Sequence, residues 1–185
     1  MILGFAGLAG AGKNEAARAF DYPQFGFADP IKEIVRNIDP CVSFHPSSGM
    51  IHLSDLLKYE SFELVKRNSK ELRRLLQEMG MAVRSINDEL WIDLLALRTK
   101  NMQSLCITDV RFENEIQFIR HEYWTPGFVI WIDRPGLEQG DHASENSITA
   151  EDCDGYVLNN GSIELLHEAV RREAHALYKN LAEQQ

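Results

Sequence analysis

Apolar residues follow two spacings along the chain, and each spacing predicts a different kind of element. Short runs rich in β-branched and aromatic residues indicate strands, whereas apolar residues three and four positions apart indicate amphipathic helices. The predicted strands are Ile2 to Ala6, Phe25 to Ala28, Ser104 to Thr108, Phe128 to Ile132 and Tyr156 to Leu158. Because helical segments alternate with these strands, we predict an α/β fold whose five-stranded parallel sheet is flanked by helices.

The segment between the second and third predicted strands is too long for a simple crossover and reads mainly as helix. Leucines and a methionine recur at helical spacing from Ser69 to Gly80, where Ser69 is the predicted cap and Gly80 the predicted stop. A second helix is predicted over Asn87 to Leu97, with Asn87 as its cap. We therefore expect a helical insert over about 39–99.

The rest of the chain is consistent with one domain, whose core consists of about 1–38 and 100–185. Helices are predicted over Phe112 to His121 and from Ser162 to about Leu181, the latter beginning with a capping signal. The irregular stretch from Asp39 to Ile51 predicts an exposed loop or an edge hairpin. A polar insert separates the last two predicted strands.

The composition narrows the classes of protein. With 185 residues, of which 44% are hydrophobic and 25% charged, the chain is long enough for one well-buried core. A net charge of −9 argues against binding nucleic acid through the general surface but allows a local anion site. Three cysteines without metal-ligand spacing, and no secretory leader, indicate reduced thiols in the cytoplasm. Since the apolar start is too short to cross a bilayer, we expect a soluble protein with no membrane partner.

A glycine-rich turn follows the first predicted strand and carries the strongest functional signal. Its glycines free the backbone to point several N–H groups at one place, and Lys13 begins the next helix. The spacing Gly7-x-x-x-x-Gly12-Lys13 is typical of loops that hold a polyphosphate. The predicted phosphate-binding residues are Gly7, Gly10, Ala11, Gly12, Lys13 and Asn14. Asn14 stands where the general motif has Ser or Thr, so an amide oxygen serves in place of the hydroxyl that helps to hold Mg²⁺, or nothing does.

Charged residues emerge where the third predicted strand ends, in Thr108-Asp-Val-Arg-Phe-Glu-Asn-Glu115. Ligands of open α/β sheets bind outside the carboxyl ends of the strands. Asp109 is therefore the candidate for the metal side of the site, and Arg111 is placed to bind a phosphate with two N–H groups. The structural alternative is that Asp109 and Arg111 pair with each other and cap the following helix.

Two other segments combine charge with a predicted helix. Asp29 and Pro30 are explained as the cap and first turn of a helix, whereas Lys32 at the same sheet edge is open to a share in acceptor binding. Arg73 and Arg74 are consecutive, so they cannot both lie on the apolar face of their helix. One of them is a candidate for binding an anion, and a solvated helix surface is the alternative.

Residues after the fourth and fifth predicted strands complete the candidate set. Arg134 precedes the polar insert, where a cation can close over transferring phosphates. Asn160 lies in a turn that caps the last helix, and such a turn can also contact a nucleotide base. His142, Ser144 and Glu145 have neither metal-ligand spacing nor the surroundings of a nucleophilic serine, so we assign them no catalytic role.

Five segments in this order resemble the deoxynucleoside monophosphate kinases of large phages over nearly the whole chain. They are Gly7 to Lys13, Phe27 to Lys32, Arg73 to Gln77 with Gly80 and Trp91, Thr108 to Glu115, and His142 to Glu145. The resemblance implies a P-loop nucleoside monophosphate kinase fold, with a helical acceptor-binding insert at about 39–99 and a lid at about 134–152. It also implies Mg-ATP-dependent conversion of a deoxynucleoside monophosphate to its diphosphate.

The resemblance assigns roles to individual positions. Gly7, Gly12 and Lys13 match the ATP phosphate loop, and Arg73 matches an arginine that faces the acceptor phosphate. Asp109 and Arg111 match the motif after the third strand. Together with the candidates argued above from their positions, the expected sets are Lys13, Asp109, Arg111 and Arg134 for catalysis; Gly7, Gly10, Ala11, Gly12, Lys13, Asn14 and Asn160 for ATP; Asp29, Lys32, Arg73, Arg74 and Trp91 for the acceptor; and Asn14 and Asp109 for Mg²⁺.

The sequence leaves several alternatives open. The chain has Gly80-Met-Ala where the family tends to have Gly-Thr-Glu, so the acceptor is less well defined than ATP. A small-molecule kinase of the same fold, acting on phosphomevalonate or dephospho-coenzyme A, is one alternative. A regulatory protein that binds ATP without transfer is another, and Asn14 is the sequence hint for it. The base, the host cytoplasm in which a phage protein would act, and assembly into a homodimer also stay open.

Overall fold

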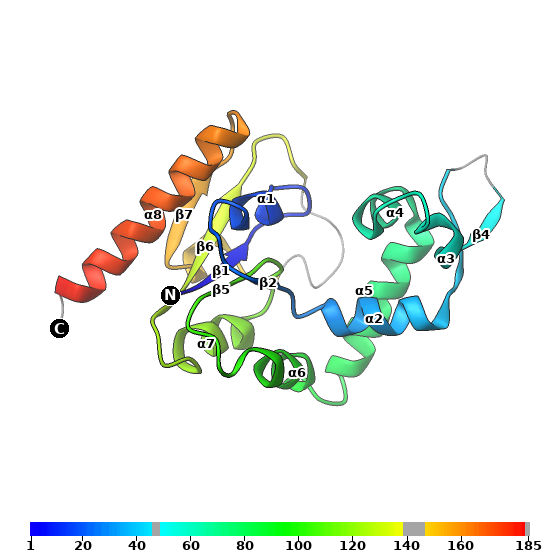
Figure 1. The fold of residues 1–185 in the computed structure, drawn as a ribbon, viewed down its shortest axis with the longest axis horizontal. Helices are drawn as coiled ribbons and strands as arrows, with labels where there is room; N and C mark the ends of the chain where they lie inside the picture. Colours follow the sequence, from blue (N-terminus) through cyan, green and yellow to red (C-terminus); the bar gives the residue numbers. More distant parts are fainter. Residues whose placement is uncertain (46–48, 139–146, 184–185) are drawn as a thin grey trace. The chain divides into compact units, whose positions relative to one another are not determined.

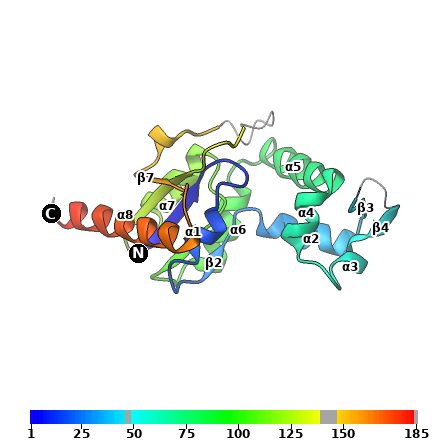
Figure 2. The same cartoon turned by 90° about the horizontal axis from the view of Figure 1, so that it is seen from above.

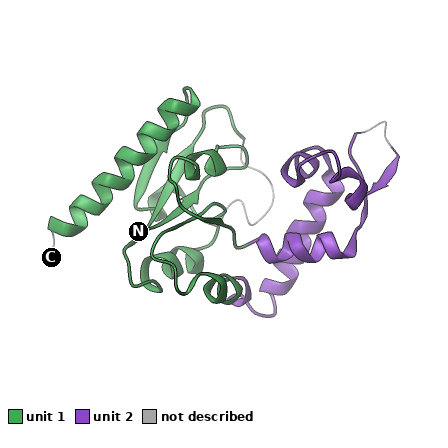
Figure 3. Cartoon of the chain, in the orientation of Figure 1, with its two compact units in different colours: residues 1–27, 92–185 green, residues 28–91 purple. Residues whose placement is uncertain are grey.

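The computed structural model describes residues 1–45, 49–138 and 147–183 (Figure 1). Its elements, in chain order, are β1 (Ile2–Ala6), α1 (Lys13–Ala17), β2 (Gln24–Phe25), α2 (Asp29–Ile38), β3 (Cys41–Ser43), β4 (Met50–His52), α3 (Leu53–Leu56), α4 (Phe62–Asn68), α5 (Lys70–Arg84), α6 (Leu90–Thr99), β5 (Leu105–Ile107), α7 (Glu113–His121), β6 (Gly127–Asp133), η2 (Ala150–Asp152), β7 (Gly155–Leu158) and α8 (Ile163–Glu183). They form two compact units (Figure 3): unit 1 is Met1–Phe27 with Ile92–Gln185, and unit 2 is Ala28–Trp91. Unit 2 overlaps the predicted insert at about 39–99 and also includes α2.

Unit 1 is built on the parallel sheet that the strand pattern predicts. Its strands are hydrogen-bonded in the order β2-β5-β1-β6-β7, and every pairing is parallel. All residues of the central strand β1 are buried. The prediction of a five-stranded parallel sheet is confirmed, although β2 is shorter than expected because Phe27 and Ala28 form a turn.

Helices cover both faces of this sheet (Figure 2). α1 and α8 pack on the face that carries Leu3 and Phe5. α7 packs on the opposite face, where a Cβ added to Gly4 would lie 2.6 Å from Cδ1 of Ile119. Because successive strand residues point to opposite faces, β1 is buried between two helical layers, and its carboxyl end leads directly into the glycine-rich turn.

Unit 2 is helical apart from one hairpin. β3 and β4 pair antiparallel, so the hairpin interpretation of the irregular stretch is confirmed for its described residues. Asp39 precedes the hairpin, and its carboxylate accepts hydrogen bonds from the backbone N–H and hydroxyl of Ser54 at 2.7 and 2.9 Å. α2 packs against α5, the longest helix of this unit.

The predicted helix starts are partly correct. Ser69 caps α5 as expected, because its Oγ accepts a hydrogen bond from the Leu72 N–H at 3.2 Å. Ser162 does the same for α8, accepting from the Leu165 N–H at 3.3 Å. α6 begins at Leu90 rather than Asn87, whose side chain instead accepts from the Glu89 N–H in the preceding turn at 3.0 Å.

Two other predicted helix ends are wrong. Gly80 does not stop α5, which continues to Arg84. A Cβ at Gly80 would lie 3.3 Å from Cδ1 of Ile31 on α2, so this glycine lets the two helices pack closely. Asp29 is not the cap of α2 but its first residue, and Ala28 occupies the cap position.

Among the described helices, none is long and apolar enough to cross a membrane.

Candidate functional site

The glycine-rich turn lies between β1 and α1, at the carboxyl end of the central strand. Gly7, Gly10 and Gly12 have φ values of 131°, 86° and 102°, a region that L side chains rarely adopt. At Gly7, a Cβ would also lie 2.2 Å from the carbonyl oxygen of Ile132 on β6. The backbone path therefore requires the glycines that the sequence motif places here.

Lys13 begins α1 and folds its side chain back over the turn. Nζ donates to the carbonyl oxygens of Gly7 at 2.7 Å and Leu8 at 2.9 Å, and the side chain is half-buried. The ammonium group thus forms a compact positive charge beside the turn. Phosphate oxygens are stronger acceptors for an ammonium than neutral carbonyls, so a polyphosphate could take over these donors.

Asn159, which follows β7, holds the other side of the turn. Its Nδ2 donates to the carbonyl oxygen of Ala11 at 2.8 Å, and its backbone N–H donates to the carbonyl oxygen of Asp133 at 2.6 Å. A Cβ at Gly12 would lie 2.6 Å from Nδ2 of Asn159. Asn159 was not among the predicted residues, whereas the adjacent Asn160 was, because two consecutive asparagines after a strand do not reveal which one points inward.

Arg111 lines a small pocket together with the turn. Gly7, Leu8 and Ala9 form one part of the lining, Arg111 another, and Trp131 of β6 a third. The structure thus places the turn beside the arginine that follows β5, as the sequence analysis expected of the two motifs. Trp131 was not predicted, since a tryptophan inside an apolar strand reads as core.

Asp109 joins the ends of two neighbouring strands. Its Oδ1 accepts a hydrogen bond from the Phe27 N–H at 2.8 Å, and a Cβ at Gly26 would lie 2.7 Å from Oδ2. Within the described ranges, no three His, Cys, Asp or Glu side chains are grouped as a metal site would require. A role of Asp109 toward Mg²⁺ stays a prediction, in which phosphate oxygens and water supply most of the ligands.

A buried carboxylate lies at the backbone of Arg111. Glu115 of α7 is 3% exposed, and its Oε2 accepts hydrogen bonds from the N–H groups of Arg111 at 2.7 Å and Phe112 at 3.2 Å. Glu115 has no predicted role of its own, because the motif that ends at this residue points to Asp109 and Arg111. Its burial is the signal that only the structure supplies.

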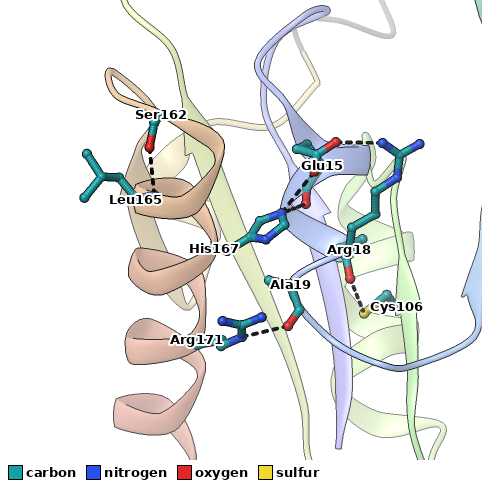
Figure 4. Close-up of polar contacts among 9 residues, drawn as sticks. Glu15, Arg18, Ala19, Cys106, Ser162, Leu165, His167 and Arg171 are labelled. Carbon is teal, nitrogen blue, oxygen red and sulfur yellow. Dashed lines mark hydrogen bonds and ion pairs between the residues drawn. The ribbon is translucent and has the colours of Figure 1, made fainter.

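α8 supports α1 through polar contacts (Figure 4). Nε2 of His167 lies 3.0 Å from the carbonyl oxygen of Glu15 and 3.1 Å from its Oε1. Nε of Arg171 donates to the carbonyl oxygen of Ala19 at 2.8 Å. The helix that begins at Lys13 is therefore anchored to the last helix of the chain.

Three predicted site residues are exposed. Asn14 lies in the first turn of α1, Arg134 directly follows β6, and Asn160 follows Asn159. Their positions leave them accessible to a ligand without defining one. The segment His142 to Glu145 lies outside the described residues, as does part of the predicted lid.

Lys32 and Asp29 belong to an ion-pair network within unit 2. Nζ of Lys32 lies 3.1 Å from Oδ1 of Asp29 and 3.5 Å from Oε1 of Glu63, and Lys66 also contacts Glu63 at 3.5 Å. Burial raises the pKa of Glu63, but Lys66 and Lys32 outweigh this effect and hold the net pKa below its ordinary value of 4.5. Asp29 thus acts as the partner of Lys32 rather than as the cap that was predicted.

The predicted acceptor residues of α5 and α6 have different surroundings. Arg73 and Arg74 are exposed; Nη2 of Arg73 donates to the carbonyl oxygen of Arg67 at 3.4 Å, and Nε of Arg74 lies 2.6 Å from Oε1 of Glu78. Trp91 is 4% exposed, and its indole N–H donates to the carbonyl oxygen of Gly80 at 3.3 Å. Its indole is therefore buried and hydrogen-bonded to α5 rather than open to solvent.

Most of the chain matches one protein family. The family described as deoxynucleotide monophosphate kinase matches residues 42–170, which include Arg73, Asp109 and Arg111 but not the glycine-rich turn. The chain belongs to the deoxynucleotide monophosphate kinase family. As a member of this family, it is a kinase with a nucleotide or another small molecule as its substrate.

Two solved kinase structures are similar to the chain at low sequence identity. A shikimate kinase structure from Aquifex aeolicus is similar at 15% identity and a TM-score of 0.46, covering 98% of this chain and 99% of that one. A dephospho-CoA kinase structure from Campylobacter jejuni is similar at 12% identity and a TM-score of 0.39, covering 92% and 94%. No curated protein sequence matches the chain.

Proposed function

We propose that this member of the deoxynucleotide monophosphate kinase family transfers the γ-phosphoryl group of ATP to a deoxynucleoside monophosphate. An oxygen of the acceptor phosphate attacks the γ-phosphorus, the bond to the β–γ bridging oxygen breaks, and ADP leaves. The products are ADP and a deoxynucleoside diphosphate. The observation that carries the proposal is the turn of left-handed glycines with Lys13 above it and Arg111 in the adjoining pocket.

The residues of unit 1 bind the polyphosphate in this proposal. Backbone N–H groups of the turn bind its oxygens, and Lys13 moves its donors from the carbonyls of Gly7 and Leu8 to the β- and γ-phosphates. Arg111 and Arg134 neutralise charge on the transferring group, because phosphoryl transfer depends mainly on alignment and electrostatic stabilisation. Asn160 is the proposed contact to the base of ATP.

Mg²⁺ fits this arrangement as an ion bound mostly by the nucleotide. Asn14 and Asp109 are the residues that would hold it, Asn14 from the exposed first turn of α1 and Asp109 from the end of β5. When bound, the ion supplies charge neutralisation across the β- and γ-phosphates. An asparagine in place of the usual hydroxyl predicts a weak protein contribution to metal binding.

Residues of unit 2 recognise the acceptor in this proposal. Arg73 binds the acceptor phosphate, because it is exposed and its described contact is a weak one to a carbonyl oxygen at 3.4 Å. Lys32, with Asp29 as its partner, is a second contact. Arg74 has a smaller share, since its guanidinium lies 2.6 Å from Glu78. We leave Trp91 out because its indole is buried.

Acceptor-dependent release of ADP tests the proposal. The four deoxynucleoside monophosphates, phosphomevalonate and dephospho-coenzyme A are supplied in turn with Mg-ATP. We expect turnover with at least one deoxynucleotide, and a loss of at least about a hundredfold in kcat/KM for Lys13→Ala. Lys179→Ala on α8, which removes an exposed lysine paired with Glu183, is the matched control and keeps the wild-type rate.

The other outcomes identify the alternatives. Turnover confined to phosphomevalonate or dephospho-coenzyme A would replace the nucleotide acceptor. ATP binding without ADP release for any acceptor would indicate a regulatory protein. A normal rate in Lys13→Ala would mean that Lys13 and the glycine-rich turn take no part in the mechanism.

A further inference from the structure

Glu115 is a buried carboxylate that accepts the N–H of Phe112 at the start of α7, as a capping box does, and also the N–H of Arg111, which a capping box does not require. It lies in the first turn of α7 with 3% exposure, whereas Glu113 in the same turn is exposed. Either carboxylate could interact with the helix dipole from solvent, so the dipole does not explain why one of them is inside. A carboxylate removed from water needs strong hydrogen-bond donors. Glu115 finds them in the backbone N–H groups of Arg111 and Phe112.

These hydrogen bonds fix a short segment that is also held at its other end. Val110 is 1% exposed, and its N–H donates to the carbonyl oxygen of Phe5 on β1 at 3.2 Å. The next two N–H groups donate to Glu115. The Arg111 side chain therefore extends from a restrained backbone and lines the pocket beside Gly7.

We propose that Glu115 is a positioning residue for phosphoryl transfer and acts by fixing the backbone of Arg111. The inference rests on the proposed role of Arg111 at the transferred phosphate. A misplacement of about 1 Å can reduce a rate on the order of a hundredfold, so a long side chain needs a fixed base. Glu115 supplies that base by accepting the N–H groups of Arg111 and of the residue after it.

Three variants distinguish the hydrogen-bond-accepting oxygen of Glu115 from its negative charge and from the general effect of an acidic residue in the first turn of α7. Glu115→Met keeps a similar length but removes the acceptor, and we expect kcat to fall by roughly ten- to a hundredfold. Glu115→Gln keeps an acceptor oxygen and should stay within about threefold of wild type. Glu113→Gln is the matched control on the same turn and is expected to leave kcat unchanged. If Glu115→Met does not fold, Glu115→Asp, whose carboxylate is one methylene shorter, takes its place with the same expected direction.

A second background tests whether Glu115 acts through Arg111. In Arg111→Ala, the further change Glu115→Met should cause no additional loss of kcat, because the group being positioned is gone. Losses that multiply in the double variant would overturn the inference, since they would mean that Glu115 acts by another route. A wild-type kcat in folded Glu115→Met, or in folded Glu115→Asp where that variant takes its place, would overturn it directly.

Amide hydrogen exchange gives a readout that does not depend on turnover. In Glu115→Met, or its replacement, the amides of Arg111 and Phe112 should exchange at least about tenfold faster than in wild type. Unchanged exchange would contradict the inference whether or not the chain is a kinase. Failure of the proposed function would give a different result. The wild-type protein would show slow exchange at both amides but would release no ADP with any acceptor.

Discussion

The glycine-rich turn of unit 1 and the arginine-bearing surface of α5 in unit 2 are built in different ways. The turn is specified by backbone, through three left-handed glycines, the Ile132 carbonyl against Gly7 and the Asn159 side chain on Ala11. Arg73 and Arg74 are exposed, and their described partners lie within the same unit. A site made of backbone tolerates few substitutions, whereas a site made of exposed side chains can change its ligand through single replacements.

Under the proposed function, this difference separates the two substrates. ATP would depend on a geometry that many residues support, including the contacts of α8 to Glu15 in α1 and to Ala19 just after it. The acceptor would depend on a few long side chains. Changes to the turn should therefore affect stability and ATP together, and changes to unit 2 should affect the acceptor alone.

The largest effect should come from Gly7→Ala. The new methyl would meet the Ile132 carbonyl oxygen at 2.2 Å in a backbone with φ of 131°. We expect a loss of at least about 3 kcal/mol in the free energy of unfolding, together with loss of ATP binding. Gly136 also has a positive φ, of 82°, but a Cβ there would meet nothing within 4 Å. Gly136→Ala should therefore lower the free energy of unfolding by only about 1 kcal/mol. Equal urea midpoints for the two variants would show that the turn is not held by close packing.

Asn159→Asp should follow in size. It places a carboxylate where an amide donates to the Ala11 carbonyl at 2.8 Å, and adds negative charge beside the turn. The KM for ATP should rise by roughly ten- to a hundredfold, while the acceptor KM stays near wild type. Asn101→Asp makes the same chemical change in an exposed turn between α6 and β5, outside the glycine-rich turn, and is the control. If both variants change the ATP KM alike, Asn159 has no special part in the turn.

Arg73→Ala should have a smaller effect, and on the KM for the acceptor rather than the KM for ATP. Loss of a charge-assisted contact to the acceptor phosphate raises the acceptor KM by about tenfold and leaves the ATP KM unchanged. Arg74→Ala should change the acceptor KM less, because its guanidinium already contacts Glu78 at 2.6 Å. Steady-state kinetics with both substrates varied distinguishes the two. A larger effect for Arg74 would reverse the assignment of the pair.

The smallest effect concerns acid stability of unit 2. The pKa of Glu63 is lowered in the folded protein, so its contribution to stability is complete above the ordinary value of 4.5 and is lost as the pH falls through the folded value. Because the Glu63 side chain is 49% exposed, the contribution should be below about 1 kcal/mol. Glu63→Gln should reduce the fall in the free energy of unfolding between pH 6 and pH 3 by about that amount, as measured by urea titration. Glu60→Gln in the same unit is the control, and an equal flattening there would contradict the role of Lys32 and Lys66.

The difference between the two regions also explains which features could be predicted from the sequence. The sheet and the turn were predictable because strand composition and left-handed glycines restrict the backbone locally. Asn159 and Glu115 were not, since their importance depends on partners that the fold brings near. Gly80 was misread because a glycine that allows close packing between helices looks the same in sequence as one that ends a helix.

The most direct test of the central claim follows the phosphoryl group itself. Wild-type protein is incubated with Mg-ATP that carries radioactive phosphorus in the γ position and with each deoxynucleoside monophosphate, and the products are separated. The account predicts label in a deoxynucleoside diphosphate, formed at least about a hundredfold more slowly by Lys13→Ala. Label found only in inorganic phosphate, or remaining in ATP for every acceptor, would contradict it.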